Sequence, residues 1–157
     1  MSFIITGLAP EPFQPLFALS EAELRERNIL RRTADAKPGY PCRITLEDAE
    51  PGETVLLLSH ESHSAATPYA SRYAIYVREG AAAANTFRDE LPPVFSNRPI
   101  ALRLFSADGM LLGADMGMNG DLKGKIEAAF ARPDVAYIHA HNAMHGCFAA
   151  EIRRAAS

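Results

Sequence analysis

Short β-prone runs separated by turn residues constrain the fold of this chain more than any other sequence feature. The clearest pair lies between Ile100 and Met116, where the favoured two-residue turn Asp108-Gly109 separates two such runs. Because strands do not alternate with crossover helices, we expect these runs to pair as antiparallel neighbours. Further β-prone runs cover residues 3–6, 29–34, 54–59, 73–78, 135–141 and 147–153.

Two segments carry helix signals. Ser20 and Glu23 have the spacing of a capping box, which predicts a helix from Ser20 to about residue 28. A second helix is predicted over residues 121–131, where apolar side chains recur with helical spacing. At 157 residues, the chain has the length of one domain. The predicted fold class is therefore α+β: a mainly antiparallel sheet with two principal helices packed on it, in a single domain.

Composition argues against several classes of partner. The net charge is −3 and the basic residues form no stripe, so neither nucleic acid nor an anionic membrane is an expected partner. No run reaches the ~18 apolar residues of a membrane span. The start, MSFIITGLAP, lacks the basic residues and long apolar run of a signal peptide. We therefore expect a cytoplasmic protein, in which both cysteines are reduced thiols.

The segment YIHAHNAMHGCF, residues 137–148, is the main candidate for a functional site because it concentrates histidine and cysteine. If residues 142–146 form a loop between two strands, His141 lies opposite Cys147 and His139 opposite Ala149. Strand alternation then places the polar set on a face that points outward or into a cleft. That set comprises Val135, Tyr137, His139 and His141. The apolar set that would face the helices comprises Ile138, Phe148 and Ile152.

Three interpretations of this segment remain open. In the first, the histidines belong to an ordinary solvated sheet face. In the second, His139 and His141, about 6.6 Å apart along the strand, bind a divalent transition metal with His145 or Cys147. In the third, His141 or His145 holds Cys147 as a nucleophilic thiolate while Asn142 orients an imidazole.

The segment DAKPGYPCR, residues 35–43, is the second candidate. Lys37 and Arg43 lie close in sequence to Cys42, and cationic neighbours favour the thiolate form of a cysteine. The simpler interpretation, which we favour, makes Cys42 a small buried hydrophobic residue. Lys37 and Arg43 are also suited to bind an anionic ligand, because arginine presents a planar fork to a carboxylate or phosphate. No glycine-rich phosphate loop supports a nucleotide cofactor.

Three stretches of the chain resemble a known family. They are DAKPGYPCRITLEDAEPGETVLLL, PYASRYAIYVRE and AYIHAHNAMHGCFAAEI. Together they look like the bacterial family called domain of unknown function 1203, over nearly the whole chain. The resemblance implies a soluble bacterial protein of one domain without an assigned activity, and it transfers no catalytic residues.

These observations lead to three hypotheses about function. The first is an enzyme or small-ligand-binding protein whose site combines the two candidate segments and takes a small anionic ligand. Its residues are His139, His141, Asn142, His145 and Cys147, with Lys37, Cys42 and Arg43 as neighbours. The second is a metal-binding protein that uses His139, His141 and His145. The third is an interaction module or homodimer that uses the outer face of the hairpin, including Tyr137 and Arg153.

Overall fold

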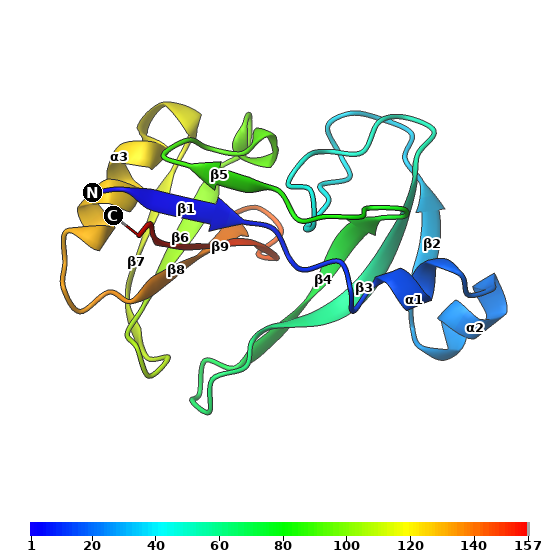
Figure 1. Cartoon of the computed structure of the whole chain (residues 1–157), viewed down its shortest axis with the longest axis horizontal. Coiled ribbons are helices and arrows are strands. Elements are labelled where there is room, and N and C mark those ends of the chain that lie inside the picture. Colours follow the sequence, from blue (N-terminus) through cyan, green and yellow to red (C-terminus); the bar gives the residue numbers. More distant parts are fainter. Residues whose placement is uncertain (157) are drawn as a thin grey trace.

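The computed structural model describes residues 1–156, which form two antiparallel sheets. The larger sheet has the strand order β5-β1-β9-β8-β6-β7 and the smaller has the order β2-β3-β4 (Figure 1). The strands are β1 (Phe3–Thr6), β2 (Leu30–Thr33), β3 (Thr54–His63), β4 (Ser71–Arg78), β5 (Thr86–Arg88), β6 (Ile100–Phe105), β7 (Leu111–Gly117), β8 (Tyr137–Asn142) and β9 (Phe148–Arg154). The helices are α1 (Gln14–Phe17), α2 (Glu21–Glu26), α3 (Asn119–Phe130) and the 3-10 turn η1 (Pro93–Phe95). No helix within residues 1–156 has the length and apolar character needed to cross a membrane.

One face of the larger sheet forms the main core with α3, which lies beside both chain ends in Figure 1. The predicted helical stripe is confirmed, because every apolar member of it on α3 is buried. Burial of these side chains supplies most of the stability of such a layer, at about 25 cal/mol for each Å² of apolar surface. The buried residues that α3 and the sheet share include Leu122, Ile126, Ala129, Phe130, Ile5, Leu102, Ile138 and Ile152.

The smaller sheet has its own apolar cluster, formed with the two N-terminal helices on the right of Figure 1. The predicted capping box of α2 is present: Ser20 Oγ accepts from Glu23 N at 3.2 Å, and Glu23 Oε1 accepts from Ser20 N at 3.2 Å. Leu24, one turn into the helix, is 1% exposed and packs into this cluster. The capping box therefore begins the helix at a point where its apolar side chain reaches the core.

The predicted antiparallel character is confirmed, since every pairing between named strands is antiparallel and helices pack on the sheets, as in an α+β or mainly β fold. Two details differ from the prediction. The strands divide into two sheets rather than one. The hairpin at Asp108-Gly109 has a connection longer than two residues, because the closing hydrogen bond joins Ser106 N to Met110 O. Within this connection, Gly109 adopts φ +83°.

The register predicted for the C-terminal hairpin was wrong. His139 lies opposite Glu151 rather than Ala149, and His141 lies opposite Phe148 rather than Cys147. Two one-residue shifts add up to this difference. Asn142 N donates to Cys147 O, so pairing extends one residue into the predicted loop, and a register shift between Ala140 and His141 adds the second. A bulge turns the side chains beyond it to the other face of a strand. Phe148 therefore joins the histidine face instead of the core that faces α3, whereas Val135, assigned to the histidine face, lies in that core.

The histidine face, predicted to point outward or into a cleft, is covered by the smaller sheet. His139 and His141 are 3% and 4% exposed because the smaller sheet packs against them. His63 of β3 meets His139 edge to face at 5.2 Å between ring centroids. Tyr73 of β4 meets His141 in the same way at 5.0 Å. The two histidines thus lie in the interface between the sheets.

A close approach of two main-chain segments gives a test of this arrangement. A Cβ at Gly7 would lie 1.9 Å from the carbonyl oxygen of Ile44, so neither segment can keep its position. We expect Gly7→Ala to lower the free energy of unfolding by about 3 kcal/mol or more in urea denaturation. Gly124→Ala is the matched control: nothing lies within 4 Å of its Cβ. Because position 124 is exposed and helical, this variant should raise the free energy of unfolding by about 0.5–1 kcal/mol. Similar stabilities of the two variants would contradict the close approach.

Candidate functional site

The loop between β2 and β3 brings Arg43 against the smaller sheet. Cys42 forms an isolated parallel bridge with Tyr76 of β4, and Arg43 N donates to Tyr76 O at 3.0 Å. On the other side, Leu8 N donates to Arg43 O at 2.8 Å. The backbone of Arg43 is therefore held between β4 and the segment that follows β1, and its side chain extends toward the larger sheet.

The Arg43 guanidinium joins this loop to the C-terminal hairpin. It donates from Nη1 to Pro41 O at 2.6 Å and from Nε to Phe148 O at 2.9 Å. Nη2 donates to Cys147 Sγ at 3.1 Å. Arg43 is only 2% exposed, and within residues 1–156 no carboxylate contacts it. Burial lowers the pKa of Arg43, and the Cys147 sulfur opposes that shift.

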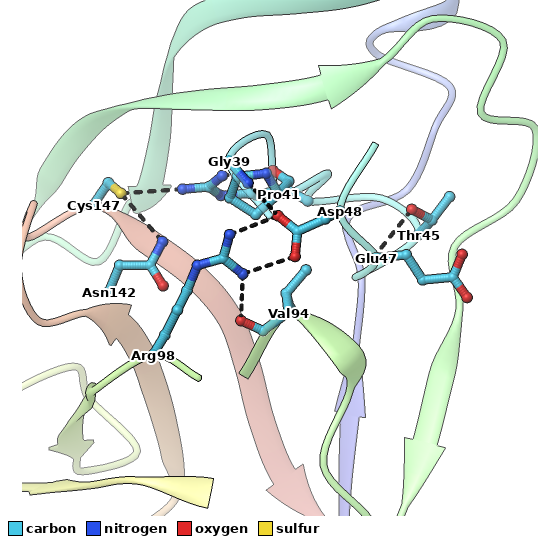
Figure 2. Close-up of polar contacts among 10 residues, drawn as sticks. Gly39, Pro41, Thr45, Glu47, Asp48, Val94, Arg98, Asn142 and Cys147 are labelled. Carbon is cyan, nitrogen blue, oxygen red and sulfur yellow. Dashed lines mark hydrogen bonds and ion pairs between the residues drawn. The ribbon is translucent and has the colours of Figure 1, made fainter. Parts of the chain in front are cut away.

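Cys147 lies at the end of the loop between β8 and β9. The loop is closed by Gly146 N, which donates to Asn142 O at 2.7 Å, and by Asn142 N, which donates to Cys147 O at 2.9 Å. The Asn142 side chain also turns toward the sulfur, with Nδ2 3.6 Å from Cys147 Sγ (Figure 2). Cys147 is a free, partly exposed thiol. Its sulfur is thus surrounded by two N–H donors rather than by a histidine.

A cleft of about 600 Å³ opens beside this group. Its basic lining residues are Arg43, Arg98 and His145, and none of the residues 1–156 that line it carries a carboxylate. Arg98 is already neutralised, because it forms a two-point ion pair with the buried Asp48 at 2.6 and 2.9 Å (Figure 2). Arg43 is consequently the cation of the cleft that lacks an acidic partner. The complete lining is Pro38, Gly39, Pro41, Arg43, Tyr73, Ala74, Tyr76, Asn97, Arg98, Pro99, Asn142, Met144, His145 and Cys147.

The front segment contributes only one of its three predicted site residues. Arg43 reaches Cys147, as the hypothesis of a combined site requires. Lys37 is exposed and pairs with Glu50. Cys42 is fully buried, and its sulfur accepts from Arg78 N at 3.2 Å, in line with the interpretation of Cys42 as a small core residue.

The histidines of the hairpin have separate surroundings. His139 Nε2 lies 3.2 Å from Glu151 Oε1, and His141 Nδ1 donates to Gly146 O at 2.9 Å. His145 lies on the exposed loop and lines the cleft. Burial lowers the pKa of His141 to about 4, although the bond to Gly146 O opposes the shift. His141 is therefore neutral at pH 7.

The structure does not gather these histidines around one point. Within residues 1–156, no group of three or more His, Cys, Asp or Glu side chains is placed to hold a metal ion. Metal binding by His139, His141 and His145 thus stays a prediction without a complete ligand set. Tyr137, predicted to lie on an outer hairpin surface for a partner, is instead buried, and its hydroxyl lies 2.6 Å from His63 Nε2.

Several important residues had no sequence signal. Arg98 and Asp48 are fifty residues apart in the chain, each in an ordinary polar loop. Tyr73 and Tyr76 are three residues apart on β4, so strand alternation alone places them on opposite faces. That both line the cleft depends on which loop docks beside β4. From the sequence, this cleft could be predicted only by assuming that the two candidate segments are in contact.

The residues that line the cleft, apart from Pro38, fall within a recognised family region. A family model described as "Protein of unknown function (DUF1203)" matches residues 39–154. That match includes Arg43, Asn142 and Cys147. No curated protein and no solved structure matches the chain.

The low pKa of His141 predicts a loss of stability in mild acid. The unfolded imidazole titrates near 6.5 and the folded one near 4, so only the unfolded chain gains this proton between those pH values. The free energy of unfolding should therefore fall as the pH decreases from about 6.5 toward 4. Burial also lowers the pKa of His63, which acts in the same direction.

Urea denaturation at several pH values would measure this loss, with His141→Asn as the comparison. The variant should lose less stability on acidification than the wild type, while His63 preserves part of the effect. NMR of the His141 ring should show no titration between about pH 7 and pH 5. A ring that titrates near 6.5 would contradict this interpretation.

Proposed function

The chain belongs to the DUF1203 family of proteins of unknown function, and we propose that this member binds a small, largely apolar anion in the cleft beside Arg43. One observation carries the proposal: a buried guanidinium at the cleft wall has two carbonyl groups and one sulfur as partners, and no carboxylate from residues 1–156.

The charge of Arg43 favours an anion. Burial of a charged group is costly unless a counter-charge and hydrogen bonds compensate for the lost water. A guanidinium has five N–H groups, and in Arg43 three of them donate to Pro41, Cys147 and Phe148. The remaining two have no acceptor within residues 1–156. A carboxylate would accept from such N–H groups and offset the charge.

The rest of the cleft favours an apolar body on that anion. Tyr73 and Tyr76 of β4 form one wall, and Pro38, Pro41 and Met144 contribute further apolar surface. Small-molecule sites commonly measure about 300–1,000 Å³ and combine an apolar lining with a few converging polar groups. The cleft has this character, because Arg43 and Asn142 are placed among aromatic and proline side chains.

Binding of matched ligand pairs tests the proposal directly. Phenylacetate and phenylacetamide have nearly the same shape and differ in charge. We expect isothermal titration calorimetry to show binding of phenylacetate at least about tenfold tighter than phenylacetamide, because only the anion compensates Arg43. Hexanoate should also bind, because it combines a carboxylate with an apolar body. Inorganic phosphate lacks the apolar body and should bind more weakly than either acid.

Three variants locate the binding. Arg43→Gln should abolish the preference for phenylacetate, and circular dichroism would check that its fold persists. Ala74→Trp should block the cleft from an exposed position on β4 without changing a charge. Arg132→Gln is the charge-matched control, since Arg132 pairs with Asp134 outside the cleft. Equal affinity for the acid and the amide, or full binding by Ala74→Trp, would contradict the proposal.

A further inference from the structure

We infer that Cys147 forms mixed disulfides with small thiols that carry a carboxylate. The inference rests on the proposed anion site, because the carboxylate of the attached thiol would occupy Arg43. It adds a covalent modification to that site and names the chemical class of the modifying molecule. Three observations support it: the exposure of the sulfur, its two N–H donors, and the charge of the cleft.

The two cysteines differ in access and in surroundings. Both are free thiols. Cys42 is fully buried among apolar side chains. Cys147 is partly exposed and lines the cleft, where Arg43 Nη2 lies 3.1 Å and Asn142 Nδ2 3.6 Å from its sulfur. A thiolate is the attacking species in thiol–disulfide exchange, and these donors stabilise negative charge on the sulfur.

The exchange step is balanced without an external oxidant. The Cys147 thiol gives its proton to water, and the thiolate attacks one sulfur of a small symmetrical disulfide. A new S–S bond forms, the original S–S bond breaks, and the departing thiolate keeps the electron pair and takes a proton from water. Because Cys42 is enclosed in the core, it does not displace the adduct, which remains until an external thiol removes it.

The adduct changes the charge balance of the cleft. Once Cys147 is in a disulfide, its sulfur no longer compensates the Arg43 guanidinium. Arg98 keeps its own partner, Asp48, and no carboxylate lines the cleft. A carboxylate on the attached thiol would therefore meet a buried cation without an acidic partner. A neutral thiol gains nothing from this cation, and a cationic thiol is repelled by it.

A series of three disulfides tests the inference: 3,3′-dithiodipropionate is anionic, bis(2-hydroxyethyl) disulfide is neutral, and cystamine is cationic. Mass spectrometry of intact protein and peptides would follow adducts on Cys147 and Cys42. Rates are divided by those of a short cysteine peptide, so that intrinsic reactivity cancels. After this correction, Cys147 should prefer the anionic probe over the cationic probe by at least about tenfold.

Variants connect this preference to the cleft. Arg43→Gln should abolish the preference, and Ala74→Trp should slow all three probes. Arg132→Gln should behave as the wild type, because Arg132 does not line the cleft. If Arg43→Gln does not fold, Ala74→Trp and the charge series on the wild type still decide the result.

Absence of a charge preference at Cys147, or faster modification of Cys42, would overturn the inference. In that case, tight binding of phenylacetate relative to phenylacetamide would leave the proposed anion site intact. If phenylacetate also failed to bind preferentially, the anion site and the mixed disulfide would both be rejected. The two experiments therefore separate failure of the covalent step from failure of the site.

Discussion

The buried guanidinium of Arg43 is the interaction on which the candidate site depends. It joins the loop between β2 and β3 to the hairpin of β8 and β9 through Pro41 O, Phe148 O and Cys147 Sγ. Three of its five N–H groups hold both segments, and the other two have no acceptor within residues 1–156, which is costly for a buried group. The same requirement gives the cleft its chemistry, because the partners available within residues 1–156 leave the positive charge without a carboxylate. Structural support and the proposed affinity for anions thus come from one side chain.

The interface between the two sheets uses polar residues in a different way. His63, His139 and His141 are packed with aromatic rings, and their ring nitrogens bond to groups inside the chain. Burial lowers the pKa of His63 and His141, so both enter this interface as neutral rings. Glu151 remains ionised at the edge: burial opposes this, but hydrogen bonds from His139 and Arg153 lower its pKa to about 2. Histidine suits this layer because it packs as a flat ring whose nitrogens can still form hydrogen bonds, two in His63 and one each in His139 and His141. His139 and His141 therefore pack between the sheets, while His145, Cys147 and Arg43 line the cleft.

Much of the local structure was predictable because its causes lie within a few residues. The capping box at Ser20, the apolar stripe of α3 and the hairpin around Gly109 all appear where their patterns indicate. The candidate site was predictable in part. Placing Arg43 beside Cys147 followed from the idea that two unusual segments meet. The assignment of a histidine as the partner of Cys147 was not supported, since a bulge near Ala140 changes which side chains share a face. A bulge depends on strand pairing, and residue alternation alone cannot reveal it.

By itself, the sequence determined the helix start, the β-prone runs, the antiparallel class and the concentration of histidine and cysteine near the C-terminus. Only the tertiary structure decided that the strands form two sheets, that the histidine face is covered, and that Arg43 is buried without a carboxylate. The reason is physical. Periodicity records which side chains share a face, but burial and charge compensation depend on what packs against that face. For Arg43 the decisive partner is 104 residues away in the chain, at Cys147.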